Sequence, residues 1–298
     1  SHSSRYECPV KKKKKAQPDE IISRTKTKTY RRCSTCGIIY ISWSSEPETT
    51  YEKQYFSEQY KKQYGKTYLE DFDFIKKNSV HRVMEINSAL RIANDYKPSV
   101  LDIGCAYGPF LSAANDMGWQ VFGTDIAIDA IEYVQSKLLF PAVCANFPKF
   151  DAGTEFGINK FDAVTMWFVI EHFSNLKEVL TSVSNILKEG GVFAFSTPSG
   201  SGVSAKYNRK SFFESSPSDH YTIWEPEKVS KILKKFGFSV VKIVSTGHHP
   251  ERFPIVVNNG WTSKEFKFKI FNKISKTLKL GDTFEVYCRK DKTQGEEK

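Results

Sequence analysis

Short apolar runs alternate with amphipathic stretches between residues 98 and 246. Residues 99–103 and 120–125 are two of the apolar runs, and each is long enough for a buried strand. The segments that follow them have apolar residues at helical spacing. Strands that alternate with helices in this way are typical of repeated βα units, and they predict an α/β fold built on a parallel sheet.

The same pattern divides the chain into three regions. Residues 1–45 are polar, basic and contain Cys, so we expect a small N-terminal appendage there. Residues 46–97 are helical in pattern and rich in Tyr. Residues 98–298 form the predicted α/β domain, interrupted by insertions at 199–222 and 247–280.

Composition restricts the class of protein. The chain has 298 residues, of which 40% are hydrophobic and 26% charged, values that are ordinary for a soluble globular protein. The longest apolar stretch, residues 161–170, is shorter than the roughly 20 residues of a membrane helix. No secretory signal is evident, so the six Cys suggest reduced thiols and a cytoplasmic protein without a membrane partner.

The net charge of +10 is concentrated at the ends of the chain. Residues 1–37 carry 11 Lys or Arg against 3 Asp or Glu, whereas residues 38–257 carry 23 against 25. A nucleic-acid footprint is usually a basic patch on the binding face. The nearly neutral central region therefore argues against nucleic acid as the partner, and the Lys11–Lys15 run is interpreted as a solvated loop.

A Gly-rich turn follows the first strand of the α/β domain. The strand leads directly into Gly104 and Gly108, and Pro109 then opens an amphipathic helix. Such a turn exposes backbone N–H groups at the crevice where α/β proteins bind nucleotides. The spacing is G-x-x-x-G, preceded by Asp102, and it differs from the G-x-G-x-x-G of a NAD site.

Asp125 ends the second strand, 23 residues after Asp102. An acid at this position can accept hydrogen bonds from both hydroxyls of a ribose. The alternative is that Asp125 only caps the next helix. The Gly-rich turn upstream favours ribose binding.

Four segments in order carry a family resemblance. Residues 101–108 and 123–126 resemble the first two motifs of the class I S-adenosylmethionine-dependent methyltransferases. Residues 160–172 resemble the family's fourth strand, and residues 187–195 its Gly-Gly turn and fifth strand. The resemblance implies a Rossmann-like methyltransferase fold: a mostly parallel seven-stranded sheet with helices on both faces. It also implies S-adenosylmethionine as the cofactor.

The resemblance assigns roles to individual positions. Gly104 and Gly108 would let the backbone approach the methionine portion of the cofactor, and Ile126 would pack on the adenine. Asn146 stands where the family usually has an Asp that recognises the adenine amine, and its side-chain oxygen can still accept a hydrogen bond. The implied cofactor-binding residues are Asp102, Gly104, Gly108, Asp125, Ile126, Asn146, Phe147 and Trp167.

Two pairs of residues near the predicted pocket can be interpreted as packing residues. Trp167 and Phe168 are neighbours at the end of the predicted fourth strand, so we expect one in the core and one on the pocket wall. Cys105 and Cys144 are interpreted as small packing residues and not as nucleophiles.

Methyl transfer requires orientation, exclusion of water and, for some acceptors, a general base. His172 follows the predicted fourth strand, and His220 lies in the sequence Asp219-His220-Tyr221. His suits proton removal from a hydroxyl at neutral pH. The catalytic candidates are therefore His172, His220 and Tyr221, and for each His the alternative is a hydrogen-bonded structural side chain.

Other segments are expected to cover the pocket. The insertions at 199–222 and 247–280 are interpreted as the lid and walls of the acceptor site. Tyr60, Tyr64 and Tyr68 recur every four residues, so they would share one helix face. That face could close over the cofactor, although plain packing onto the domain is the favoured interpretation.

The N-terminal region contains a C-x-x-C-G motif at Cys33 and Cys36. Cys8 resembles the start of a second motif, but position 11 is Lys. The layout is similar to the N-terminal zinc ribbon of some class I methyltransferases. Because structural zinc normally takes four ligands and only Cys8, Cys33 and Cys36 are available, the sequence favours a zinc-free relic over an occupied site.

Three functions remain open from sequence alone. The first is a methyltransferase acting on a small polar metabolite, such as a sugar or nucleotide-sugar. The second is an RNA methyltransferase that uses the basic N-terminus, although residues 166–169 lack the motif usual in nucleobase amine methyltransferases. The third is a non-catalytic cofactor-binding module, which the near-complete cofactor motifs disfavour.

Overall fold

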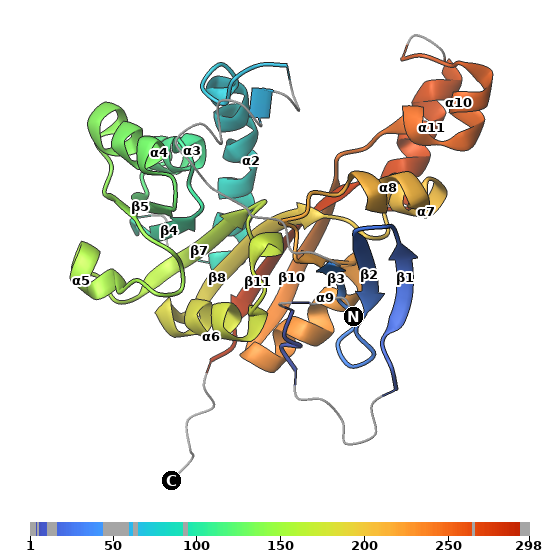
Figure 1. Ribbon diagram of the computed structural model, residues 1–298. Helices are drawn as coiled ribbons and strands as arrows, with labels where there is room; N and C mark the ends of the chain where they lie inside the picture. The colour runs from blue at the N-terminus through green and yellow to red at the C-terminus, as the bar shows by residue number, and fades with distance from the viewer. Residues whose placement is uncertain are drawn as a thin grey trace.

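The computed structural model describes residues 4, 6–10, 17–43, 60–61, 65–91, 95–263 and 266–292. Its centre is a seven-stranded sheet with strand order β10-β11-β8-β7-β4-β5-β6 (Figure 1). The strands are β4 (Ser99–Ile103), β5 (Gln120–Asp125), β6 (Ala142–Cys144), β7 (Phe161–Trp167), β8 (Leu187–Pro198), β10 (Phe238–Thr246) and β11 (Thr283–Lys290).

Parallel pairing dominates this sheet. β4 pairs in parallel with β5 and β7, and the pairs β5–β6 and β7–β8 are also parallel. Only β11 runs antiparallel, between β8 and β10. The predicted mostly parallel seven-stranded sheet is confirmed. Its parallel strands bring their carboxyl ends to one edge, where ligands bind in open α/β sheets.

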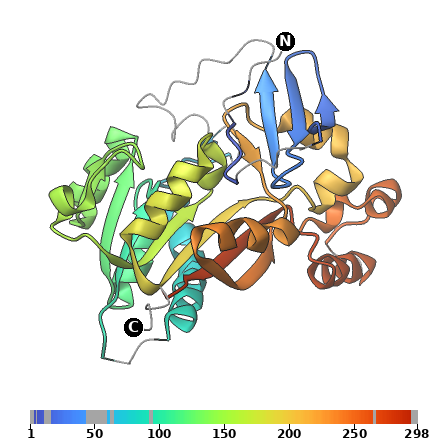
Figure 2. The same cartoon turned by 90° about the horizontal axis from the view of Figure 1, so that it is seen from below.

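Helices cover both faces of the sheet (Figures 1 and 2). One apolar core lies under α2, α3 and α4, and the other under α5, α6 and α9. The helices and short helical turns of the domain are α2 (Phe72–Leu90), α3 (Pro109–Asp116), α4 (Ile128–Tyr133), η2 (Val134–Leu138), α5 (Ala152–Phe156), η3 (Ile170–His172), α6 (Leu176–Ile186), α9 (Pro226–Leu233) and η4 (Lys234–Phe236).

The sequence of α6 shows why these helices form and dock. Leu176, Val179, Leu180 and Val183 recur at the spacing of one helix face, and all four are buried. Asn175 caps the start of the helix by accepting a hydrogen bond from the Glu178 amide.

The N-terminal appendage forms a second, four-stranded sheet in the order β1-β2-β3-β9. Its strands are β1 (Glu20–Arg24), β2 (Lys28–Arg32), β3 (Ile39–Trp43) and β9 (Thr222–Ile223). The fourth strand comes from the insertion at 199–222, through the pairs Ile39–Ile223 and Tyr40–Thr222. The sequence did not predict this pairing, because a two-residue strand has no recognisable pattern.

The two insertions differ in position. The first carries α7 (Val203–Tyr207) and α8 (Arg209–Ser215). The second carries η5 (Pro250–Arg252), α10 (Pro254–Asn259) and α11 (Phe266–Thr277), and it projects from the body of the molecule (Figure 1). It packs mainly on itself, through a small cluster that includes Phe253, Val256 and Leu280.

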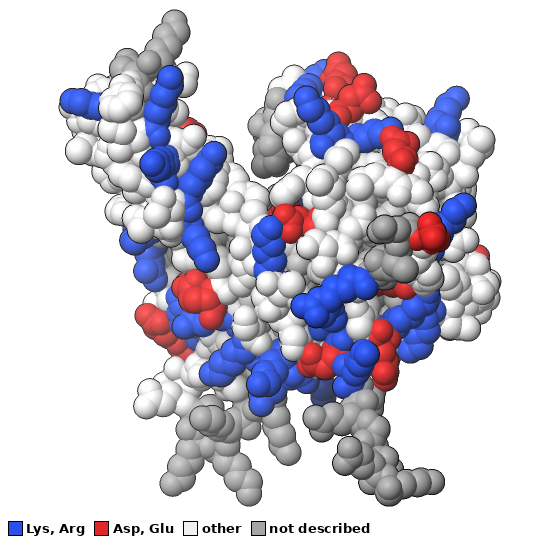
Figure 3. Space-filling view, turned by 180° about the vertical axis from the view of Figure 1, so that it is seen from behind, with Lys and Arg blue, Asp and Glu red and all other residues white. Residues whose placement is uncertain are grey.

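On the face shown in Figure 3, Lys and Arg are interspersed with Asp and Glu over the body of the molecule. On α11 the described charged side chains are Lys267, Lys269, Lys273 and Lys276, all exposed. None of the helices in the described residues is both long enough and apolar enough to cross a membrane.

The segment before α2 does not form the single helix that was expected to carry Tyr60 and Tyr68 on one face. Tyr60 and Tyr68 do not lie on one continuous helix, because Gly65 makes a turn between them with a φ of 77°. Their rings still meet edge to face, with centroids 5.0 Å apart. Tyr64 lies outside the described residues.

Candidate functional site

A cavity of about 1130 Å³ opens at the carboxyl edge of β4, β5 and β7. Its walls come from α2, the Gly-rich turn after β4, the ends of β5 and β7, the segment after β6 and the insertion at 199–222. This is the position where the βα pattern predicted a nucleotide site.

The Gly-rich turn is shaped by contacts that exclude larger residues. Gly104 has a φ of 73°, and a Cβ at this position would overlap the side chain of Val169. The amides of Gly104 and Cys105 both donate to the Thr124 carbonyl oxygen, at 2.7 and 3.1 Å. The turn is therefore tied to β5, and its backbone lines the cavity.

Gly108 serves a different purpose in the described structure. It has a φ of 81° at the start of α3, and a Cβ there would come within 2.8 Å of Leu138. It permits close packing between α3 and η2, and it is not among the residues that line the cavity. Its assignment to the cofactor stays a prediction.

Asp125 braces the turn as well as facing the cavity. Its side chain is 6% exposed. One carboxylate oxygen accepts from the Ala106 amide and the other from the Ala127 amide, each at 2.9 Å. Burial raises its pKa above the usual value, although three backbone amides oppose that effect. Asp125 lines the cavity and accepts a hydrogen bond from the amide of Ala127, which is itself the N-cap residue of α4, so Asp125 does not cap the helix directly, and ribose binding stays a prediction.

The other predicted cofactor residues lie around Asp125. Ile126, Asn146 and Phe147 line the same part of the cavity. Ile126 is 43% exposed, so an apolar surface faces the opening.

Asp102 lies at the floor of the cavity and is fully buried. Thr165 donates a hydrogen bond to it at 2.6 Å. Burial raises the pKa of Asp102 to about 7, and the Thr165 hydrogen bond and the charge of Arg82 act in the opposite direction.

Arg82 is a cavity residue that sequence reasoning missed. Its Nε lies 2.8 Å from Glu285 Oε1, and its guanidinium lies 4.2 Å from the centre of the Trp167 ring. Arg82 comes from α2, before the recognisable motifs, and nothing in its local sequence distinguishes it from other helix cations. The Glu285 partner comes from β11, 203 residues away.

Trp167 packs against the apolar core with its indole nitrogen buried, and Phe168 is 42% exposed on the cavity wall, as the expectation of one core and one wall residue has it, although Trp167 also lines the cavity. β7 ends at Trp167, and Phe168 has a φ of 60°. The alternation rule applies only within a strand, and this left-handed residue turns its side chain back toward the opening.

Two predicted catalytic residues meet in the wall of the cavity. The rings of His172 and His220 are perpendicular, with centroids 4.8 Å apart. His172 Nδ1 lies 3.3 Å from Asp219 Oδ2. Asp219 was not predicted as a site residue, and its place beside His220 in sequence was the available signal.

The surroundings shift the pKa values of the two imidazoles in opposite directions. Burial alone would lower the pKa of His172, but the Asp219 hydrogen bond and the charge of Glu171 outweigh it, so the pKa is raised. Burial and the neighbouring His172 lower the pKa of His220 to about 3. His220 is therefore neutral at pH 7, whereas the pKa of His172 lies above its usual value.

Glu171 and Tyr221 complete this corner. Glu171 is 1% exposed, and burial raises its pKa to about 7. A carboxylate oxygen of Glu171 and one ring nitrogen each of His172 and His220 lie within 4.8 Å of one another. Tyr221 lines the cavity, but its ring also packs edge to face on Trp43 of the N-terminal sheet.

Comparison with known proteins identifies the family. The model of a family described as a methyltransferase domain matches residues 77–243, more than half of the chain. The chain belongs to the methyltransferase domain family. The cavity therefore lies in the part of the chain that carries the family's fold.

Two curated relatives each match part of the chain. An uncharacterized protein of Methanocaldococcus jannaschii is 29% identical over 45% of this chain and 50% of its own length. A ubiquinone biosynthesis O-methyltransferase of Colwellia psychrerythraea is 28% identical over 34% of this chain and 42% of its own. The chain thus spans half or less of these two relatives.

The fold is also that of a solved methyltransferase. The SAM-dependent methyltransferase of Archaeoglobus fulgidus has a TM-score of 0.52 and 18% identity, covering 78% of this chain and 98% of that one. The resemblance stated from the sequence motifs is confirmed at the level of family and fold.

The two insertions contribute unequally to this methyltransferase fold. Phe212, Pro217 and other residues of the first line the cavity. Among the described residues of 247–280, none lines it, so the interpretation of that segment as a pocket wall is wrong. Its aromatic side chains instead pack together away from the sheet edge.

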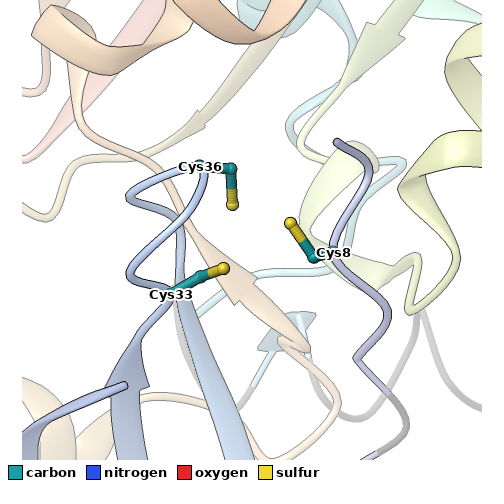
Figure 4. A group of neighbouring side chains, drawn as sticks. All are labelled: Cys8, Cys33 and Cys36. Atoms are coloured by element: carbon teal, nitrogen blue, oxygen red, sulfur yellow. The ribbon is translucent and has the colours of Figure 1, made fainter. Parts of the chain in front are cut away.

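The three predicted metal ligands lie together, outside the cavity. The sulfur atoms of Cys8, Cys33 and Cys36 are within 4.8 Å of one another (Figure 4). All three are free thiols.

Proposed function

We propose that this protein is an S-adenosylmethionine-dependent O-methyltransferase of a small hydroxylated molecule. The observation that carries the proposal is the set of residues that line one cavity. A Gly-rich turn braced by a buried Asp and an Asp–His pair line the same cavity.

The residues around the Gly-rich turn fit the cofactor. Gly104 provides a backbone surface that a Cβ would fill. Each Asp125 oxygen has a further lone pair for a ribose hydroxyl. Ile126 would pack on the adenine, and the Asn146 oxygen would accept from its amine. Asp102 would face the cationic methionine end.

When bound, S-adenosylmethionine supplies an activated methyl group on a sulfonium. His172 would accept the proton of the acceptor hydroxyl at Nε2, because Asp219 engages Nδ1 and fixes the ring. Neutral His220 would hold the acceptor by a hydrogen bond. The aromatic wall would exclude water.

The acceptor is a small molecule in this proposal. The sugar or nucleotide-sugar inferred from the sequence stays a prediction. A phenol is the second candidate, favoured by the aromatic lining from Phe168, Phe173 and Phe212. The alignment with an O-methyltransferase of ubiquinone biosynthesis supports a small acceptor.

Transfer of a radiolabelled methyl group would test the proposal. Nucleotide-sugars, simple phenols and total RNA would be offered separately to the full chain. We expect label in one small-molecule class, and loss of nearly all of it in His172→Gln. His249→Asn is the matched control, because His249 lies outside the cavity and pairs with the exposed Glu251. Label in RNA alone, or equal label with both variants, would contradict the proposal.

A further inference from the structure

Two thiols of the cluster, Cys33 and Cys36, come from the knuckle, the tight turn of residues 33–37 between β2 and β3. The Cys33 amide donates to the Ile38 carbonyl oxygen at 2.9 Å, and the Gly37 amide donates to the Cys33 carbonyl oxygen at 2.8 Å. Gly37 has a φ of 84°, a conformation that favours Gly. This tight turn brings Cys33 and Cys36 to the same side, and Figure 4 shows both sulfurs facing that of Cys8.

The spacing of the sulfurs suits a cation. Tetrahedral zinc with Zn–S bonds of about 2.3 Å separates two sulfurs by about 3.8 Å. The three sulfurs here are already within 4.8 Å of one another, so movements of about 1 Å would close the site. Cys33 and Cys36 are buried, while Cys8 is half-buried and leaves a path for an ion.

A fourth donor is present that counting Cys residues could not reveal. The Tyr6 hydroxyl lies 2.9 Å from the Cys36 sulfur. Its ring is stacked on Tyr40 of β3, with centroids 4.5 Å apart, which fixes the direction of the hydroxyl. Tyr6 lies two residues before Cys8, so one short segment supplies two donors.

We propose that Cys8, Cys33, Cys36 and the Tyr6 oxygen bind one zinc ion as a closed, structural site. Structural zinc typically takes four ligands without an open position, most often three or four Cys thiolates with His as the alternative fourth donor. In this site the Tyr6 oxygen would take that fourth position, with loss of its proton on binding. The expectation of a zinc-free relic rested on the missing fourth Cys, and Tyr6 removes that objection.

The cluster lies where a bound ion would link segments of the chain next to the cavity. The Glu7 amide donates to the Ser174 carbonyl oxygen, two residues after His172. The Ile41 amide donates to the carbonyl oxygen of Tyr221, the residue after His220. An ion that joins residues 6–8 to the knuckle therefore ties together the two segments that carry the cavity histidines.

Zinc content of the purified full chain tests the inference, and it requires no acceptor or cofactor. We expect one zinc per chain and retention against a weak chromophoric chelator. Cys33→Ser should lose the ion. Tyr6→Phe should release it to the chelator at least about tenfold more readily. Cys144→Ser is the matched control, because this thiol lies outside the cluster, and it should keep one zinc.

Two further measurements exclude a folding artefact. Cobalt added to zinc-free wild-type protein should give the strong charge-transfer absorption of several thiolates, and Cys33→Ser should weaken it. Removal of zinc should increase hydrogen exchange at the Ile41 and Glu7 amides, with β4 unchanged. Absence of zinc and cobalt binding, or a Cys33–Cys36 disulfide in the isolated protein, would overturn the inference. Unchanged zinc retention in Tyr6→Phe would remove Tyr6 from the site.

Discussion

Individual side chains in the cavity have structural and chemical roles at once. Asp125 was predicted as a ribose ligand, yet in the structure it also holds the Gly-rich turn and the start of α4 through two backbone amides. Sequence could place Asp125, because its position at a strand end is local information. It could not pair Arg82 with Glu285 or Asp219 with His172, because these partners come from distant elements.

The first prediction at this scale concerns Asp102. Burial raises its pKa to about 7, so much of it is protonated in mildly acidic solution. A cationic ligand favours the carboxylate and lowers its pKa in the complex. Affinity for S-adenosylmethionine should therefore fall below pH 7, by up to about tenfold per pH unit, and level off above it. Arg82, Asp125 and Thr165 are the polar groups that face this carboxyl group.

Calorimetric titration across pH checks this dependence. Asp102→Asn should flatten the profile, which separates Asp102 from Glu171, whose pKa is also about 7. A flat profile in the wild-type protein would refute the assignment.

The second prediction concerns the Asp219–His172 pair. The negative charge of Asp219 stabilises protonated His172, so its removal should lower the pKa of His172. In Asp219→Asn the acidic limb of the rate profile should move to lower pH. The plateau rate should drop by about 100-fold, because the ring loses its orientation. Glu171 and His220 are the other titratable groups facing His172.

Rate profiles of methyl transfer measure both effects. Glu251→Gln is a matched control, since Glu251 forms an exposed pair with His249. A limb at the wild-type pH with a lower plateau would show that Asp219 acts only on structure.

Among the elements, the parallel strands of the central sheet were the most predictable, whereas their order within the sheet was not predicted. β4 and β5 have the bounds read from sequence, because buried parallel strands are continuous apolar runs between breakers. The insertions were not predictable in this way. Both contain aromatic residues after a strand, but only the first returns to the sheet edge, where β9 anchors it to β3. That anchor depends on two residues and a distant strand.

The third prediction separates the insertions. Phe212 on α8 lines the cavity, whereas Phe266 on α11 is 77% exposed and does not. Phe212→Ala should raise the Michaelis constant for the acceptor by about tenfold, since an aromatic contact is lost, and leave cofactor affinity unchanged. Phe266→Ala should change neither value. Equal effects of the two substitutions, measured by steady-state kinetics, would argue against this division.

At the scale of the whole molecule, the segment that follows β8 of the central sheet also supplies β9, the last strand of the N-terminal sheet. The central sheet positions the cavity, and the N-terminal sheet holds residues 221–223 through β3. Sequence motifs predicted the central sheet, since four local patterns in order specify it. The second sheet could not be derived from its own 45 residues, because its last strand belongs to the insertion.

The central claim is that the cavity at the carboxyl edge of the sheet binds S-adenosylmethionine. Calorimetric titration of the wild-type protein with S-adenosylhomocysteine tests it most directly, alongside Asp125→Asn and the surface control Asp116→Asn. Asn is preferred to Ala because it keeps an acceptor for one of the two amides that Asp125 holds. We expect one site per chain in the wild type and in Asp116→Asn. In Asp125→Asn we expect affinity weakened at least tenfold, since each lost charge-assisted hydrogen bond contributes roughly 1.5–3 kcal/mol. No binding by the wild type, or equal affinity in Asp125→Asn, would contradict the claim.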